Sequence, residues 1–208
     1  MNINNIHNTC LDEKLDLPKP NYWLGVWDGP IYYRKMFTSL IREYKTNVVE
    51  IGSHNGSTTY FLGKMLEPFN KKVYTIDPWN GAQEGNDSVY KDYLNNTKDL
   101  TNLVTMRESS LSHIAYWHLK NTDYGICYID GLHTREGIRN DIRMVSATIK
   151  APYVMLIDDY DMPEIADEID IAVKGNVIQL INPPNQDMFY NNYPDKGRKF
   201  AICIKGVA

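Results

Sequence analysis

The chain has 208 residues, a formal net charge of −4 and a hydrophobic content of 43%. This size and composition suit a single domain with a sizeable core and exclude an intrinsically disordered chain. The mild acidity gives no basic surface for nucleic acid, and apolar runs such as residues 154–157 are far too short to span a bilayer.

Residues 1–46 are expected to form an N-terminal strap and helix that pack on the core. Residues 1–30 are polar at first and then aromatic, and a helix is predicted to follow with Phe37, Leu40 and Tyr44 on one face. Because the first ten residues have no apolar signal-peptide region, we expect a cytoplasmic protein.

Residues 47–208 are assigned to one domain, in which short apolar runs alternate with segments of helical period. Each run is rich in β-branched or aromatic residues and is bounded by turn residues, which is typical of strands. Helical stripes lie between the runs, for example Ile138, Ile142 and Val145 at spacings of three and four. The predicted strands are residues 48–51, 73–76, 103–106, 124–129, 153–157, 177–181 and 200–204.

This alternation predicts an α/β fold, a Rossmann-like and mostly parallel sheet of seven strands with helices on both faces. No helix separates the last two strands, so the final strand is expected to be antiparallel. Cys127 and Cys203 lie inside apolar runs, whereas Cys10 lies in the polar N-terminal segment. We expect Cys127 and Cys203 to be small buried hydrophobes, because no paired spacing indicates a disulfide or metal site.

Polar residues follow several of the predicted strands directly. In an open parallel sheet, ligands bind beyond the carboxyl ends of the strands. Burying an unpaired carboxylate costs several kcal/mol, so the series favours a site over a core explanation. The residues at these ends are Gly52, Asp77, Ser110, Asp130, Asp158 and Asp159.

The first strand runs into a loop with two glycines, Gly52 and Gly56, which allow a tight turn and close approach of a ligand. His54 and Ser57 stand where a dinucleotide fingerprint requires glycine, so a pyrophosphate is disfavoured. Asp77, after the second strand, is placed to accept hydrogen bonds from ribose hydroxyls. The pattern therefore favours a nucleoside ligand without phosphates.

Glu50-x-Gly52-x-x-x-Gly56 and Tyr74-Thr-Ile-Asp77-Pro-Trp79 resemble the first two motifs of class I S-adenosylmethionine-dependent methyltransferases. The resemblance covers roughly residues 47–160 and implies S-adenosylmethionine as the cofactor. It implies that the Gly52 loop contacts the methionine part, Asp77 the ribose and Ser110 the adenine edge, and that Glu50 orients the loop or the amino group. The implied cofactor-binding residues are Glu50, Gly52, Ser53, Gly56, Ser57, Asp77, Ser110 and Asp130.

Two further stretches resemble the metal-dependent O-methyltransferases of the macrocin type, which mostly methylate sugar hydroxyls. They are Tyr128-Ile-Asp130-Gly-Leu-His133 and Leu156-Ile-Asp158-Asp159-Tyr160. The resemblance implies that Asp130, Asp158 and Asp159 hold a divalent metal, with Mg²⁺ the expected ion. It also implies that His133 is the base, which makes Asp130 and His133 the expected catalytic residues.

The chemistry agrees with these residue types. A hydroxyl acceptor is mostly protonated near neutrality, and binding it to a metal ion lowers its pKa and fixes its position. Carboxylates suit Mg²⁺, Mn²⁺ or Ca²⁺ better than Zn²⁺, and a histidine titrates in the range needed to take the proton. Asp158 and Asp159 are adjacent, so they can share an ion only if Asp159 has already left the strand.

The expected function is methyl transfer from S-adenosylmethionine to a hydroxyl of a small molecule, with a sugar or sugar nucleotide as the leading acceptor. The alternatives are a catechol-like phenol as acceptor, a non-catalytic S-adenosylmethionine-binding protein, and a nicotinamide-dependent oxidoreductase, which the missing glycines disfavour. Residues 20–35 and 182–199 are expected to line the acceptor pocket, because such pockets come from variable loops. An ordinary strap and hairpin loop are the alternative, and homo-oligomerisation is left open.

Overall fold

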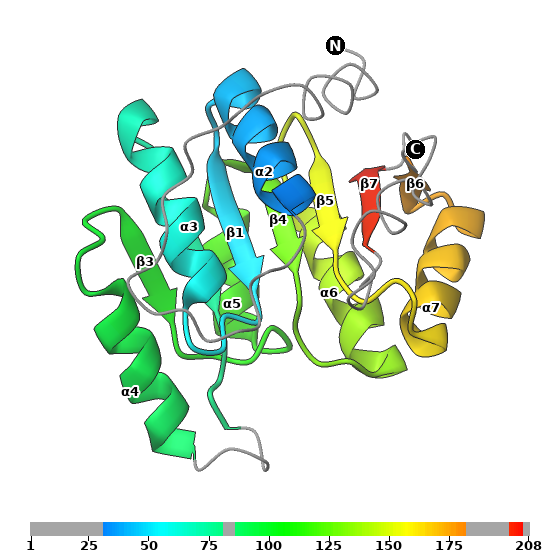
Figure 1. Ribbon diagram of the computed structural model, residues 1–208. Helices are drawn as coiled ribbons and strands as arrows, with labels where there is room; N and C mark the ends of the chain where they lie inside the picture. Colours follow the sequence, from blue (N-terminus) through cyan, green and yellow to red (C-terminus); the bar gives the residue numbers. More distant parts are fainter. Residues whose placement is uncertain (1–30, 81–85, 182–199, 206–208) are drawn as a thin grey trace.

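The computed structural model describes residues 31–80, 86–181 and 200–205 (Figure 1). Residues 1–30, in the expected strap, and residues 182–199, in the expected acceptor loop, lie outside this part, and so does Cys10. The division into residues 1–46 and 47–208 therefore stays a prediction. Within the described part, none of the helices is long and apolar enough to cross a membrane.

The seven strands form one sheet in the order β3-β2-β1-β4-β5-β7-β6. The first five strands pair in parallel, and β7 runs antiparallel to both β5 and β6. The predicted mostly parallel sheet with an antiparallel final strand is thus confirmed. The strands are β1 (Asn47–Ile51), β2 (Val73–Ile76), β3 (Leu103–Met106), β4 (Tyr124–Ile129), β5 (Val154–Ile157), β6 (Ile178–Leu180) and β7 (Ala201–Lys205).

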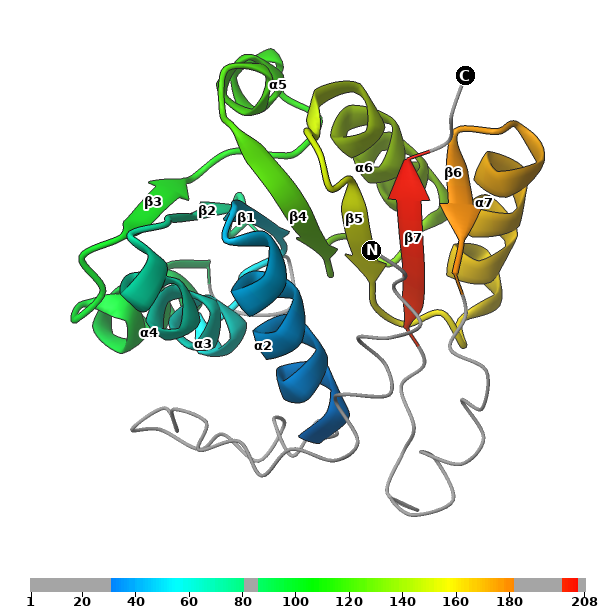
Figure 2. The ribbon, with the colours of Figure 1, turned by 90° about the horizontal axis from the view of Figure 1, so that it is seen from above.

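Helices cover both faces of the sheet, with α2, α3 and α4 on one side and α5, α6 and α7 on the other (Figure 2). Phe37 of α2 and Phe61 of α3 are buried in one cluster, and Ile142 of α6 and Ile169 of α7 are buried in the other. The helices are α2 (Ile31–Tyr44), α3 (Ser57–Leu66), α4 (Asn86–Thr97), α5 (His113–Lys120), α6 (Arg135–Thr148) and α7 (Pro163–Lys174), and a 3-10 turn, η1 (Glu67–Phe69), follows α3.

The predicted apolar stripes face the core. Ile138, Ile142 and Val145 of α6 are all buried. Thr134 precedes α6 in an extended conformation, and its side chain accepts a hydrogen bond from the backbone N–H of Gly137, which starts the helix. Cys127 and Cys203 are free and buried, as predicted.

The chain order of the strands reverses between β1 and β4. The chain passes from β1 to β2 and β3 on one side, and from β4 to β5 on the other. Open α/β sheets bind ligands at such a switch point, beyond the carboxyl ends of the strands. The ends of β1 and β4 are joined there by the backbone N–H of Asp130, which donates to the carbonyl of Ile51 at 2.8 Å.

Candidate active site

A pocket of about 640 Å³ opens at the carboxyl ends of β1, β2 and β4. Its volume lies in the range of sites for small molecules and cofactors. Four of the predicted site residues do not line this pocket, namely Glu50, Gly56, Asp158 and Asp159. The predicted site residues that line it are Gly52, Ser53, Ser57, Asp77, Ser110, Asp130 and His133.

Gly52 is required at the turn after β1 for two reasons. Its φ of +86° lies in the left-handed region that favours glycine. A Cβ atom at this position would stand 1.9 Å from the carbonyl oxygen of Asp130, so the ends of β1 and β4 touch here. Gly56, with a φ of +84°, then forms the N-cap of α3. The backbone of this loop therefore lines the pocket next to the contact between the ends of β1 and β4.

Asp77 fixes this loop and still faces the pocket. Its Oδ2 accepts hydrogen bonds from the backbone N–H groups of Ser53 at 2.8 Å and His54 at 2.9 Å. Its Oδ1 accepts the backbone N–H of Trp79 at 2.8 Å. A carboxylate offers about four acceptor positions, so one remains for a ligand hydroxyl. The geometry is compatible with the predicted ribose contact, which stays a prediction.

Glu50 lies behind the loop, fully buried in β1. Its Oε2 accepts hydrogen bonds from the hydroxyls of Ser53, at 3.0 Å, and Thr59. Its Oε1 has no hydrogen-bond partner among the described residues. Burial raises the pKa of Glu50 to about 8, so its side chain is mostly neutral at pH 7. Glu50 thus connects the loop to the start of α3. Of its two predicted roles, these contacts are compatible with orienting the loop.

Ser110, predicted at the adenine edge, lines the pocket, and its hydroxyl is near enough to the carboxylate of Asp141 to lower the pKa of that group. Asp141 is 1% exposed in α6, and burial raises its pKa to about 6. The sequence analysis missed Asp141. A signal was present in the sequence, because Asp141 lies three residues after Ile138 and directly before Ile142, on the apolar stripe of α6. A buried carboxylate is costly unless another group pairs with it, so its position indicates a partner.

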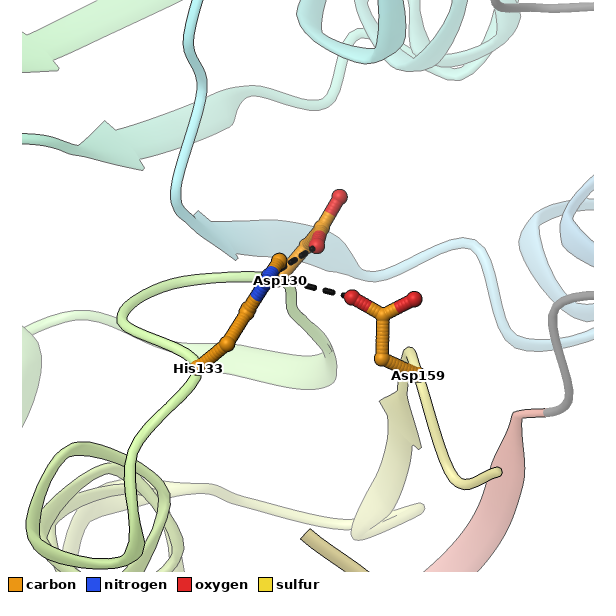
Figure 3. A group of neighbouring side chains, drawn as sticks. All are labelled: Asp130, His133 and Asp159. Atoms are coloured by element: carbon orange, nitrogen blue, oxygen red, sulfur yellow. Dashed lines mark hydrogen bonds and ion pairs between the residues drawn. The ribbon is translucent and has the colours of Figure 1, made fainter. Parts of the chain in front are cut away.

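Asp130, His133 and Asp159 meet beyond the ends of β4 and β5 (Figure 3). Two of them, Asp130 and His133, line the pocket. His133 Nε2 lies 3.2 Å from Asp130 Oδ1 and 3.1 Å from Asp159 Oδ2. The three side chains each offer one ligand atom, and these atoms lie within 4.8 Å of one another. Asp159 has a φ of +54° and follows the last residue of β5 by two positions, so it has left the strand, as metal sharing requires.

Asp158, the third predicted metal ligand, is not one of the three side chains of this cluster, and its role as a ligand stays a prediction. Its Oδ2 accepts a hydrogen bond from the hydroxyl of Tyr128 at 2.7 Å, and its Oδ1 accepts the backbone N–H of Asp159 at 2.8 Å. The side chain of Asp158 is buried, and Asp159, which follows it in the chain, belongs to the cluster. Tyr128 belongs to the sequence motif that ends at His133, and the sequence predicted no role for it.

The cluster has the donor set of a divalent cation site. The carboxylates of Asp130 and Asp159 are hard oxygen ligands that suit Mg²⁺ or Mn²⁺, the metals that the sequence predicted, and the imidazole of His133 lies beside them. Burial raises the pKa of Asp130 to about 6, and the neighbouring carboxylates of Asp158 and Asp159 push it in the same direction. The His133 side chain is 40% exposed, so its imidazole is accessible from the pocket. A cation would relieve the repulsion between these carboxylates.

Comparison with known proteins identifies the family. Residues 49–160 match the family model of a methyltransferase domain, a segment that runs from β1 past the end of β5. No curated protein sequence matches the chain.

Solved structures with the same fold include methyltransferases of several kinds. The Podospora anserina methyltransferase PaMTH1, bound to SAH, has a TM-score of 0.61 and 9% identity over 86% of this chain and 80% of its own. CalS11, a TDP-rhamnose 3'-O-methyltransferase of calicheamicin biosynthesis, has a TM-score of 0.58 and 14% identity over 83% and 76%. The ribosomal protein L11 methylase of Lactobacillus delbrueckii subsp. bulgaricus has a TM-score of 0.53 and 12% identity over 85% and 80%.

At these identities the structural likeness shows the fold, whereas the family rests on the matched segment. That segment covers more than half of the 208 residues and holds the glycine loop, Asp77 and the cluster at the ends of β4 and β5. The chain therefore belongs to the methyltransferase-domain family and is an S-adenosylmethionine-dependent methyltransferase.

Proposed function

We propose that this enzyme methylates a hydroxyl oxygen of a small molecule with the help of a divalent metal ion. The observation that carries the proposal is the convergence of Asp130, His133 and Asp159 at the edge of the pocket that Asp77 and the Gly52 loop also line. A base and a cation site beside a cofactor pocket are what an unactivated hydroxyl needs.

The cofactor is proposed to bind in the pocket at the carboxyl ends of β1, β2 and β4. Asp77 is placed for the ribose, the Gly52 loop for the methionine part and Ser110 for the adenine edge, since all three line one continuous pocket. His133 and Asp130 line the same pocket from β4. An acceptor that enters beside His133 would therefore share one cavity with the cofactor, and this proximity lowers the entropic barrier to transfer.

His133 is proposed to take the proton of the acceptor hydroxyl at Nε2. The oxygen–methyl bond forms while the sulfur–methyl bond of the cofactor breaks, which leaves S-adenosylhomocysteine, the methyl ether and a protonated imidazole. Asp130 and Asp159 lie within 3.2 Å of Nε2, so an acceptor oxygen bound at these carboxylates would lie beside the base. Such a base contributes about 10²–10⁴-fold to the rate. A divalent ion bound by Asp130 and Asp159 would lower the pKa of the hydroxyl.

A saccharide is proposed as the acceptor, and a catechol-like phenol is the alternative. Two observations support the saccharide: the residues around Asp130 and Asp158 resemble the macrocin-type enzymes, and CalS11, which shares the fold, acts on TDP-rhamnose. The fold itself does not select the acceptor, because a ribosomal protein methylase shares it too.

The proposal is tested by methyl transfer from labelled S-adenosylmethionine to a panel of sugar nucleotides and catechols. The purified chain is assayed after EDTA treatment and again after Mg²⁺ or Mn²⁺ is added back. We expect chelation to abolish turnover and the added ion to restore it. Turnover that chelation leaves unchanged would exclude the metal, and SAH binding without product on any acceptor would favour a non-catalytic binding protein.

The base is tested with His133→Gln. We expect kcat to fall about 10²–10⁴-fold, with SAH affinity by calorimetry within a factor of two of the parent. His113→Gln is the matched control, because His113 is exposed at the start of α5 and does not line the pocket. A His133→Gln variant with the parent's kcat would exclude His133 as the base.

A further inference from the structure

The hydroxyl of Tyr128 touches two carboxylates at the ends of two neighbouring strands. Tyr128 lies in β4 and is 1% exposed. Its hydroxyl donates to Asp158 Oδ2 at 2.7 Å and lies 3.3 Å from Asp130 Oδ2. A phenol has one hydrogen to donate, and 2.7 Å is in the range for a hydroxyl that donates to a carboxylate. The bond to Asp158 is therefore the main one.

The position of this phenol is fixed by packing. The ring of Phe37, from α2, meets the Tyr128 ring edge-on with centroids 5.3 Å apart. Every residue of β4 is buried, so a phenylalanine would fill the same space without a polar atom. Burying a hydroxyl costs free energy unless it is hydrogen-bonded. The hydroxyl at residue 128 is thus explained by the carboxylates it contacts and not by the core.

A chain of contacts leads from Tyr128 to the cation-binding cluster. Asp158 receives the Tyr128 hydroxyl on Oδ2, and on Oδ1 it receives the backbone N–H of Asp159 at 2.8 Å. Asp159 needs such support, because its φ of +54° is unfavourable for a residue with a side chain. The same hydroxyl also contacts Asp130 on the other strand. The Tyr128 hydroxyl thus contacts Asp130 directly and is connected to Asp159 through Asp158.

We propose that Tyr128 is a positioning residue that holds Asp130 by direct contact and Asp159 through Asp158, at the spacing at which the two carboxylates bind a divalent cation. In this arrangement Asp158 is an anchor for the loop after β5. The inference rests on the proposed metal dependence. It adds Tyr128 and Asp158 as residues that support the proposed ligands. Partners behind the ligands of a metal site typically change its affinity about 10–100-fold when they are lost.

The test is Mn²⁺ binding to the full chain in the presence of SAH, followed by electron paramagnetic resonance of the free ion. We expect Tyr128→Phe to bind Mn²⁺ about 10–100-fold more weakly than the parent, with SAH affinity within a factor of two. Tyr124→Phe is the matched control, since Tyr124 is equally buried at the other end of β4 and its hydroxyl contacts Thr148 at 2.6 Å. It should keep the parent's Mn²⁺ affinity.

The outcomes separate this inference from the proposed function. Equal Mn²⁺ affinity of Tyr128→Phe and the parent would overturn the inference and leave the metal site intact, whereas a parent that binds no Mn²⁺ would overturn both. If Tyr128→Phe does not fold, Tyr128→Met removes the same hydroxyl with a side chain that adapts to the core. The double variant with Asp158→Asn should lose less affinity than the sum of the two single losses, because the direct contact of Tyr128 with Asp130 is all that remains to be lost, and fully additive losses would refute the path through Asp158.

Discussion

Glu50 couples the stability of this fold to pH. Its side chain is fully buried in β1, and burial raises its pKa from 4.5 to about 8. In the unfolded chain the group is exposed and has its ordinary pKa. Between these two values the folded state binds more protons than the unfolded state, so the free energy of unfolding falls as the pH rises. The folded state is therefore most stable at acidic pH, where Glu50 is neutral, and it loses stability as Glu50 becomes charged.

The size of this effect follows from the two pKa values. They differ by about 3.5 units (8 minus 4.5). Each unit corresponds to about 1.4 kcal/mol, so the contribution of Glu50 to the free energy of unfolding falls by roughly 5 kcal/mol across the window. Roughly 3 kcal/mol of that fall is expected between pH 4.5 and pH 7. This is a large fraction of the stability of an ordinary domain.

The perturbation is Glu50→Gln, measured by urea unfolding of parent and variant at pH 5, 6, 7 and 8. Glutamine does not titrate, so the stability of the parent relative to the variant should decline steadily with pH. Asp141, whose pKa is raised to about 6, titrates in both proteins, and its contribution cancels in the difference. A difference that is the same from pH 5 to pH 8 would refute the burial argument.

Glu168→Gln is the matched control with the opposite sign. Glu168 is also buried, but Arg139 donates to both of its carboxylate oxygens, at 2.8 Å and 2.6 Å. The hydrogen bonds and charge of Arg139 lower the pKa of Glu168. Its stabilisation is present above the unfolded pKa and is lost as the pH falls through the folded value. This variant should therefore be less stable than the parent at neutral pH, with a gap that closes on acidification.

Three further substitutions probe the pocket. Gly52→Ala should abolish SAH binding in calorimetry, because its Cβ would stand 1.9 Å from the Asp130 carbonyl oxygen at a φ of +86°; retained affinity would contradict the close contact. Asp77→Asn should weaken SAH binding roughly tenfold or more by removing a charged acceptor, and an unchanged dissociation constant would exclude the ribose contact. Asp141→Asn should raise the midpoint of thermal unfolding relative to the parent above pH 6 but not at pH 4, since burial raises the pKa of Asp141; the reverse order would show that the charge is stabilised.

Much of the fold was predictable because it follows from local patterns. The apolar runs predicted all seven strands to within one residue at each end. Period 3.6 placed Ile138 and Ile142 on the buried face of α6. The absence of a helical segment between the last two strands predicted the antiparallel β7. The N-terminal strap and the acceptor loops stay predictions, as they fall largely outside the described residues.

The candidate site was predictable in composition and not in its internal contacts. The sequence placed Asp77, Asp130 and Asp159 after strands, and parallel strands end at one edge of the sheet, so their neighbourhood followed from the fold class. It predicted Asp158 as a metal ligand, which stays a prediction, and it did not predict that the Asp158 carboxylate accepts a hydrogen bond from Tyr128. It also missed Asp141, whose partner Ser110 precedes it by 31 positions, a distance that no local pattern spans.

The sequence by itself determined which residues follow each strand and that the loop after β1 contains two glycines. Only the tertiary structure decided which of these residues touch. β4 and β5 pair with Tyr128 opposite Leu156, and this register brings the Tyr128 hydroxyl to Asp158, 30 positions along the chain. The left-handed backbone at Asp159 then turns its carboxylate toward His133. Strand register and a single positive φ are set by packing across the sheet, so no periodicity in the chain encodes them.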